Sequence, residues 1–121
     1  MARTAITATT ITGIDSNGYN LTDSSDFDTL STGAANGVSF AHDPADVVIL
    51  KNDTGGAAIF SLITGATGTI TAIGGSVVDA TVTVAAGKTH VLPGLPTVLK
   101  QTDGDAYIDC DVAGKILVLN K

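Results

Sequence analysis

Four aspartates near the C-terminal end of the sequence are the residues best suited to chemistry: Asp103, Asp105, Asp109 and Asp111. Asp109 and Asp111 alternate onto the same side of an expected strand, about 6.5 to 7 Å apart, where a hard cation such as calcium could bridge them. The segment lacks the ligand series and closing Glu of an EF-hand, and it is not a calcium-binding repeat. We predict a solvated hairpin tip and polar sheet face with no metal or cofactor, and a cation bound over 103–111 is the alternative.

The single cysteine and the two histidines do not form a reacting group in the sequence. Cys110 shares its expected strand face with Ile108 and Val112, which predicts a buried, unreactive thiol. Neither His42 nor His90 is placed by sequence to activate a nucleophile, and two isolated histidines do not make a zinc site. No phosphate-binding glycine loop and no nucleophile elbow are present. We therefore predict that the chain is not an enzyme and has no catalytic residues.

The composition predicts a β-protein. All 12 acidic residues are Asp, so Glu, the best acidic helix former, is absent, while Thr, Val, Ile, Ala and Gly are abundant. Hydrophobic residues make up 44% of the chain and aromatic residues only 4%, which predicts a core of small aliphatic side chains. Charged residues make up only 15%, so we expect part of the neutral surface to contact a partner.

Charge and segment patterns exclude several classes of partner. The net charge is −6, and the six cations are scattered rather than clustered, which argues against nucleic acid as a ligand. The charge-free stretch 55–78 is interrupted by Gly and Thr throughout, so we expect no membrane span. A lone cysteine excludes an internal disulfide and suits synthesis in a reducing cytoplasm, and the first residues lack a secretory signal pattern.

Strand patterns separated by turn residues run along the whole sequence. We predict a strand or extended arm over 1–11, a long polar loop over 15–37 with a short helical turn over 25–30, and an edge strand over 38–40. A strand buried on both faces is predicted over 47–50. Further strands are predicted over 57–63, 67–73, 77–84, 89–92, 97–101, 106–112 and 115–119.

Turn residues join these strands and indicate the architecture. The turns at 102–105 and 113–114 are expected to form hairpins between the last three strands. About eight or nine short strands at this spacing predict an all-β, antiparallel β-sandwich, of jelly-roll or immunoglobulin-like type. We assign residues 1–121 to a single domain, because a chain of this length supports one core.

The order of several short segments resembles the decoration, or minor capsid, proteins of tailed bacteriophages. The segments, which together span nearly the whole chain, are Ala2-Arg3-Thr4-Ala5-Ile6-Thr7, Ala35-Asn36-Gly37-Val38-Ser39-Phe40, Val48-Ile49-Leu50-Lys51-Asn52, Val84-Ala85-Ala86-Gly87-Lys88-Thr89, Leu95-Pro96 and Asp103-Gly104. The long Asp-rich stretch 15–36 departs from the family pattern. The resemblance implies a β-sandwich that binds the outside of the phage head, clamps neighbouring capsomers and stabilises the lattice, often as a trimer.

Under this hypothesis the partners are the major capsid protein and further copies of the chain, and the location is the capsid surface of the virion. The stretch 4–11 lies against the capsid or a neighbouring subunit by strand addition, and apolar side chains of the loop fill a groove. The predicted contact residues are Thr4, Ile6, Ile11, Phe27, Leu30 and Phe40. A fibre-tip or carbohydrate-binding module and a head-tail neck component are the alternatives; the absence of Trp argues against a sugar-stacking platform.

Overall fold

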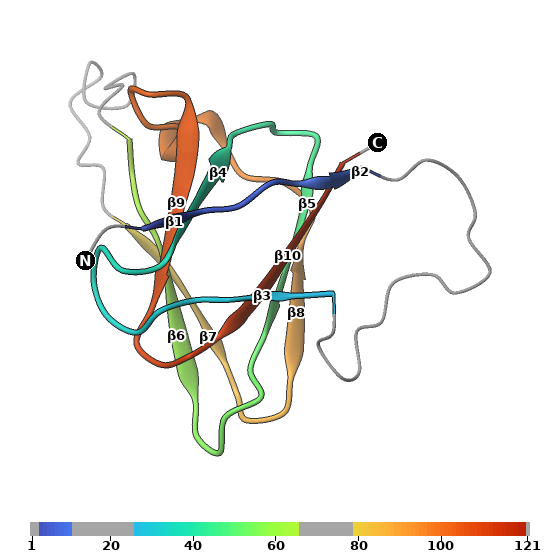
Figure 1. The fold of residues 1–121 in the computed structure, drawn as a ribbon, viewed down its shortest axis with the longest axis vertical. Coiled ribbons are helices and arrows are strands. Elements are labelled where there is room, and N and C mark those ends of the chain that lie inside the picture. The colour runs from blue at the N-terminus through green and yellow to red at the C-terminus, as the bar shows by residue number, and fades with distance from the viewer. Residues whose placement is uncertain (1–2, 11–25, 66–78, 121) are drawn as a thin grey trace.

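Two β-sheets pack face to face in the computed structural model, which describes residues 3–10, 26–65 and 79–120 (Figure 1). Sheet A has the strand order β1 (Thr4–Ala5), β4 (Val38–Ala41), β9 (Asp105–Cys110), β6 (Ala58–Leu62) and β7 (Ala80–Val84). Sheet B has the order β2 (Thr9–Thr10), β10 (Lys115–Asn120), β5 (Val47–Lys51) and β8 (Thr89–Leu92), and β3 (Asp28–Thr29) also pairs with β10. The described residues contain no α-helix, which confirms the predicted all-β sandwich.

The strand connections identify the sandwich as a jelly roll. Counted from β3, the described residues form eight strands that change sheet at each step except from the fourth to the fifth, which both lie in sheet A. Sheet B pairs the first strand with the eighth, the eighth with the third and the third with the sixth. Sheet A pairs the second with the seventh, the seventh with the fourth and the fourth with the fifth. All six pairings are antiparallel, as in two nested Greek keys, whereas the constant-type immunoglobulin sandwich places its first and last strands in different sheets.

A segment that precedes these eight strands joins the two sheets along one side. We call residues 3–10 the N-terminal arm. Its first part, β1, pairs in parallel with β4 of sheet A, and its second part, β2, pairs in parallel with β10 of sheet B. Figure 1 shows the arm crossing from one sheet to the other. It therefore covers one edge of each sheet, beside β4 and beside the end of β10, which would otherwise expose unpaired backbone groups.

One hydrophobic core lies between the sheets. In β5 and β10 the inward residues are Val48, Leu50, Ile116 and Val118, and Phe60 of β6 packs from the opposite sheet. The remaining buried members of this core are Leu30, Val38, Phe40, Ala58, Leu62, Val84, Leu95, Leu99, Ala106, Ile108 and Cys110. The aliphatic core predicted from the composition is confirmed, and Cys110 belongs to it as the strand alternation predicted.

Several predicted elements differ in the structure. The helical turn over 25–30 is wrong: within its described part, Asp28–Thr29 pairs with β10 as a strand. The strand over 97–101 is replaced by a 3₁₀ helix at Thr97–Leu99, which follows Pro96. The strand at 38–40 is not an edge strand, because β4 lies between β1 and β9. The strand predicted over 67–73 lies outside the described residues.

The turn at 113–114 does not form a hairpin. It carries the chain from β9 in sheet A to β10 in sheet B, so the two strands do not pair with each other. Gly114 passes so close to Phe60 that a Cβ on it would lie 2.5 Å from the ring carbon Cζ. The turn at 102–105 does close on itself, since the Gln101 amide donates to the Asp105 carbonyl. No helix in the described part of the chain is long and apolar enough to cross a membrane.

Candidate functional site

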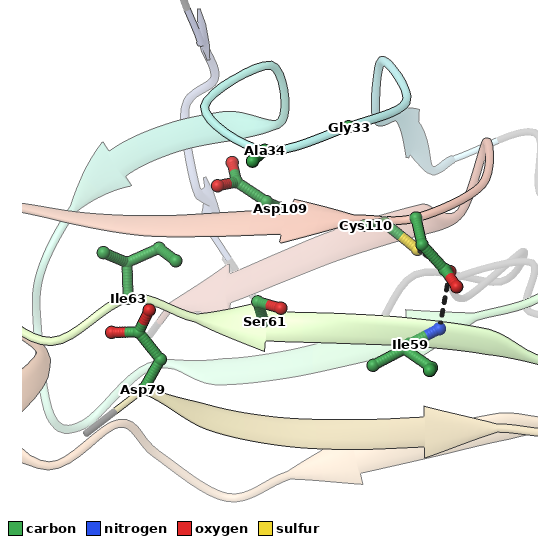
Figure 2. Close-up of a pocket in the computed structure, with 9 residues that line it drawn as sticks. Gly33, Ala34, Ile59, Ser61, Ile63, Asp79, Asp109 and Cys110 are labelled. Atoms are coloured by element: carbon green, nitrogen blue, oxygen red, sulfur yellow. Dashed lines mark hydrogen bonds between the residues drawn. The ribbon is translucent and has the colours of Figure 1, made fainter.

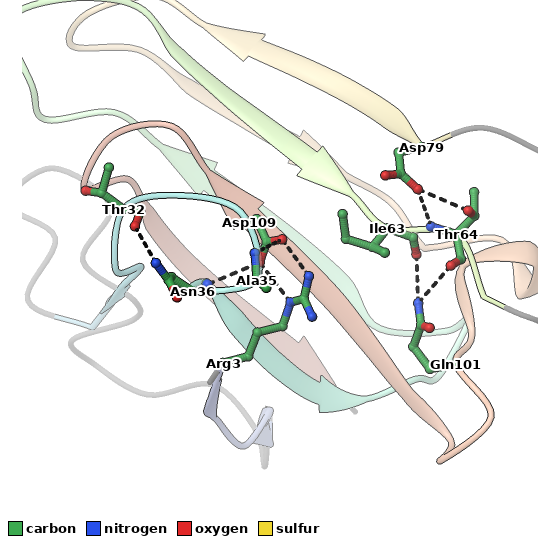
Figure 3. Close-up of polar contacts among 10 residues, drawn as sticks. Arg3, Thr32, Ala35, Asn36, Ile63, Thr64, Asp79, Gln101 and Asp109 are labelled. Carbon is green, nitrogen blue, oxygen red and sulfur yellow. Dashed lines mark hydrogen bonds and ion pairs between the residues drawn. The ribbon is translucent and has the colours of Figure 1, made fainter. Parts of the chain in front are cut away.

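A buried carboxylate on the outer face of sheet A holds the N-terminal arm. Arg3 donates from Nε to Asp109 Oδ1 at 2.8 Å and from a terminal guanidinium nitrogen to Oδ2 at 2.6 Å (Figure 3). The backbone amides of Ala35 and Gly37 donate to the same carboxylate at 2.9 and 3.1 Å. We call Asp109, Ala35 and Gly37 the Asp109 socket. A two-point guanidinium–carboxylate pair is among the stronger and more geometrically specific contacts available to a protein.

The backbone of the loop 33–37 is shaped to form this socket. Ala35 has a φ of +62°, a left-handed conformation that is unfavourable for residues with a side chain. Gly37 lies directly against β9, where an added Cβ would be 2.0 Å from the Ile108 carbonyl oxygen. The close approach therefore requires glycine at position 37, and it brings the amides of the loop within reach of the carboxylate.

The charged state of Asp109 is stabilised by its surroundings. Burial by itself raises the pKa of the Asp109 carboxyl, but hydrogen bonds from Arg3, Ala35 and Gly37 outweigh it, so the pKa lies below its usual value. The Arg3 guanidinium also lies 4.5 Å from the centre of the Tyr107 ring, which adds a cation–π contact. The arm is therefore fixed by contacts with two residues of β9.

A groove of about 340 Å³ runs beside the socket on the same face of sheet A (Figure 2). Its floor is formed by Ile59 and Ser61 on the outward side of β6 and by Ile63 just after the strand, and the loop at Gly33 and Ala34 forms one wall. The other lining residues are Asp79, Asp109, Cys110 and Asp111. The groove therefore combines apolar floor residues with three carboxylates.

The carboxylates of the groove are engaged in the fold. Asp79 accepts from the Thr64 amide at 2.8 Å and from the Thr64 hydroxyl at 3.0 Å (Figure 3). Asp111 accepts from the Ile59 amide at 2.8 Å. At the nearby turn, the Tyr107 hydroxyl donates to Asp103 at 2.6 Å, which lowers the pKa of Asp103. These aspartates accept hydrogen bonds from nearby segments of the chain and so stabilise the fold.

The predicted solvated face over 103–111 is wrong for Asp109, which is only 4% exposed. Asp109 and Asp111 do lie on the same side of the sheet, as alternation predicted, but the loop 33–37 and Arg3 cover that side at Asp109. No group of three or more His, Cys or Asp side chains among residues 3–10, 26–65 and 79–120 could hold a metal ion.

A row of apolar side chains crosses the outer face of sheet B. Val91, Ile49 and Leu117 are directly opposite one another in β8, β5 and β10. Ile49 and Leu117 are buried although they alternate with the inward-facing residues, so β5 is buried on both faces as predicted. Val91, at the edge of the sheet, is 58% exposed. The row therefore ends in an apolar side chain that is open to a partner.

The predicted contact residues occupy different environments. Leu30 and Phe40 are 0% and 3% exposed and belong to the core, so they cannot contact a partner in this fold, and that prediction is wrong for both. They were expected at the surface because they lie in or beside a polar stretch, but the chain packs them between its own sheets. Ile11 lies outside the described residues.

Three of the predicted contact residues stay accessible or partly accessible. Thr4 is exposed in β1, and Ile6 is half-buried against the core from the arm. Phe27 is half-buried, and its ring centre lies 5.8 Å from the Lys51 ammonium. Of the predicted contact segments, the arm is therefore the one whose strand partners are known: it pairs with β4 and β10 of its own chain.

The cysteine and the histidines lie in separate places. Cys110 is buried in sheet A, and burial is the main cause that raises the pKa of its thiol. His90 is exposed in β8 of sheet B, and the His42 ring contacts the carbonyl oxygen of Leu95 at 3.0 Å. The structure does not bring these three side chains together into one site.

The sequence alone did not indicate the Asp109 socket or the outer row of sheet B. Arg3 is one of only six cations, and the segment Ala35-Asn36-Gly37 was noted only for its order in the chain. Their partner, Asp109, is 72 to 106 positions away. Comparison with known proteins adds no further assignment, because no protein-family model, curated protein or solved structure matches the chain.

Proposed function

We propose that the protein is a capsid decoration protein, which binds the outside of a bacteriophage head as a homo-oligomer and stabilises the lattice. The observation that carries the proposal is the N-terminal arm, which adds a strand to both sheets of a jelly roll. Strand addition is a general way in which chains attach to one another, and jelly rolls are common in viral shells. The resemblance in segment order along the chain supports the same conclusion.

The chemistry of the described side chains also suits an adhesive role. Asp79, Asp109 and Asp111, the carboxylates of the groove, bind backbone amides of neighbouring segments. Val91 exposes an apolar surface at the end of the outer row of sheet B. A protein that binds only the assembled lattice stabilises it by its binding free energy, and no reaction is needed.

The proposal is tested with heads of the phage that encodes the chain, purified with and without this protein. The expected result is that the added protein sediments with the heads, appears as ordered density outside the shell, and raises the temperature at which the heads release DNA. A variant lacking residues 1–10 is compared at matched concentration, and weaker binding is expected. If the intact protein neither sediments with the heads nor changes their stability, the proposal is wrong.

A carbohydrate-binding module is the second candidate, and the groove on sheet A is the observation in its favour. Carboxylates accept hydrogen bonds from sugar hydroxyls, and three of them line the groove. However, none of the described residues that line it is aromatic, whereas sugar rings usually stack on aromatic faces. Binding on a glycan array that is lost in Ser61→Trp, which fills the groove, would favour this candidate over decoration.

A further inference from the structure

We propose that the N-terminal arm is exchanged between copies of this chain. In the oligomer, residues 3–10 of one copy pair with β4 and β10 of its neighbour, and Arg3 enters the neighbour's Asp109 socket. The exchange rests on the homo-oligomer of the proposed function and names the surface through which its copies are joined. Exchange of an identical segment is a low-cost route to an oligomer, because each contact is kept and only the chain that supplies it changes.

The first support is the specificity of the receiving surface. The Asp109 carboxylate accepts two hydrogen bonds from the loop 33–37, through the Ala35 and Gly37 amides, and two from Arg3 of the arm. The arm adds parallel strand pairs to β4 and β10, and its half-buried Ile6 and Ala8 pack against the core. Loss of the arm would leave a buried carboxylate and two open edges, so an arm that leaves must be replaced by an equivalent one.

The second support is the length of chain between the arm and the jelly roll. Within one chain, Thr10 pairs with Asn120 and Asp28 pairs with Ile116 of the same strand. These two positions on β10 are about 13 Å apart. The 15 residues of 11–25 can span roughly 50 Å when extended. This connection is therefore much longer than the path within one chain requires, and the excess length leaves room for the arm to pair with a second copy.

The receiving surface and the arm also carry opposite charges, although the chain as a whole is acidic. With a net charge of −6, copies of the chain repel one another in general. The arm brings a guanidinium to a carboxylate that is only 4% exposed and is held in its charged form. The exchange thus places one opposite-charge contact across each junction between copies, at a site where water does not compete strongly.

The test uses cysteines at Ala5 and Ser39, which are register partners in β1 and β4. Directly paired strand positions have a spacing that a disulfide can bridge. Isotope-labelled Ala5→Cys and unlabelled Ser39→Cys chains are refolded together and oxidised, and mass spectrometry identifies the linkage. The native Cys110 does not compete, because it is buried and its thiol pKa is raised. The expected product is a disulfide between residue 5 of one chain and residue 39 of the other.

Two variants make the outcome decisive. Deletion of 14–21 leaves seven of the 15 residues of 11–25, which span at most about 25 Å, still enough for the path within one chain but with about half the original reach. It should reduce the interchain product at least about tenfold. The double variant Ala5→Cys/Ser39→Cys with the same deletion should still close its intrachain disulfide, which shows that it folds. If the mixed single variants give no interchain product while the full-length double variant closes within one chain, the exchange is disproved.

The same samples separate this inference from the proposed function. If the protein binds heads but forms no interchain disulfide, the decoration role is supported and the exchange is disproved. Protein that forms the interchain disulfide but does not bind heads supports the exchange and overturns the decoration role. Arg3→Ala is expected to lower the yield of the interchain product, because the socket then no longer holds the arm.

Discussion

Arg3 and Asp109, 106 positions apart in the sequence, form a two-point ion pair with N–O distances of 2.8 and 2.6 Å. The pair connects the arm to the centre of sheet A, and the side chains are 18% and 6% exposed. Because the carboxylate also accepts two backbone amides, it fixes the loop 33–37 as well as the arm. One side chain on β9 thus organises two segments that come early in the sequence.

Arg3→Ala should lower the free energy of unfolding by about 1 to 3 kcal/mol, because it leaves the Asp109 charge buried with only part of its hydrogen bonds. Urea unfolding at neutral pH measures the change. Lys88→Ala removes a cation from an exposed turn and should change stability by less than about 0.5 kcal/mol. Equal effects of the two substitutions would show that the ion pair contributes nothing beyond net charge.

The Asp109 socket should make the fold sensitive to acid. The pKa of Asp109 is lowered in the folded state, so its contribution is complete above the ordinary aspartate pKa of about 3.9 and is lost as pH falls through the folded-state pKa. Urea midpoints measured from about pH 7 down to about pH 2 should decline more steeply for the native protein than for Asp109→Asn. Parallel declines in the two proteins would assign the acid sensitivity to other groups.

Gly37→Ala should be among the most damaging single-methyl additions, because the new Cβ would lie 2.0 Å from the Ile108 carbonyl oxygen and 2.7 Å from Asp109 Cα. The loop must move away from β9, which separates its amides from the carboxylate. We expect a loss of about 2 to 4 kcal/mol in thermal or urea unfolding. Gly55→Ala is the matched control, since a Cβ there meets no atom of the described residues within 4 Å. A loss below about 0.5 kcal/mol at position 37 would contradict the close approach.

Local patterns in the sequence were sufficient to predict many of the strands but not how they pair. The apolar run at 47–50 and the strand at 89–92 appear in the structure as β5 and β8. Such strands can be predicted because their residue pattern is local in the sequence. The choice between a jelly roll and an immunoglobulin sandwich depends on the pairing of β3 with β10, the first and last of the eight jelly-roll strands, which lie far apart in the sequence. Periodicity carries no information about such distant partners.

The same limit explains the errors at the candidate site. Alternation correctly placed Asp109 and Asp111 on one face, but only the folded chain shows that Arg3 and the loop 33–37 cover Asp109. Leu30 was interpreted as a surface residue because it lies in a polar stretch, and Phe40 was predicted on a short edge strand. In the structure the Leu30 amide donates to the Gly114 carbonyl, so the loop is held where the chain passes between sheets and its apolar side chain enters the core.

Asp46 should contribute to stability with a pH dependence opposite to that of Asp109. Burial first, and the charge of Asp43 second, raise its pKa, although His42 lowers it in part. The folded state therefore binds the proton more tightly, and this contribution to stability falls as pH rises above about 3.9. Its Oδ1 and that of Asn120 are both buried and have no hydrogen-bond partner among the described residues. The β5–β10 register continued by one residue places Asp46 and Asn120 opposite each other.

Replacing this carboxylate with an amide provides a donor between the two oxygens. Asp46→Asn should raise the free energy of unfolding by about 1 kcal/mol at neutral pH and have little effect in acid, measured by urea unfolding. Asn120→Asp is the opposing variant, because it places a second carboxylate beside the first and should destabilise the fold at neutral pH. Destabilisation by Asp46→Asn at neutral pH would mean that the Asp46 charge is favourable where it lies.

Val91→Asp should weaken attachment to the phage head without destabilising the isolated protein. Val91 is 58% exposed at the end of the row formed with Ile49 and Leu117, so a carboxylate there remains in water in the free protein. On a partner surface the same carboxylate would be desolvated opposite an apolar contact, at a cost of about 1 to 3 kcal/mol or roughly 5- to 150-fold in affinity. Co-sedimentation with heads measures the affinity, and urea unfolding confirms that stability is unchanged. Ile59→Asp, at a side chain 42% exposed on the opposite sheet, is the matched control. Loss of binding in Ile59→Asp but not in Val91→Asp would assign the contact to the groove of sheet A instead.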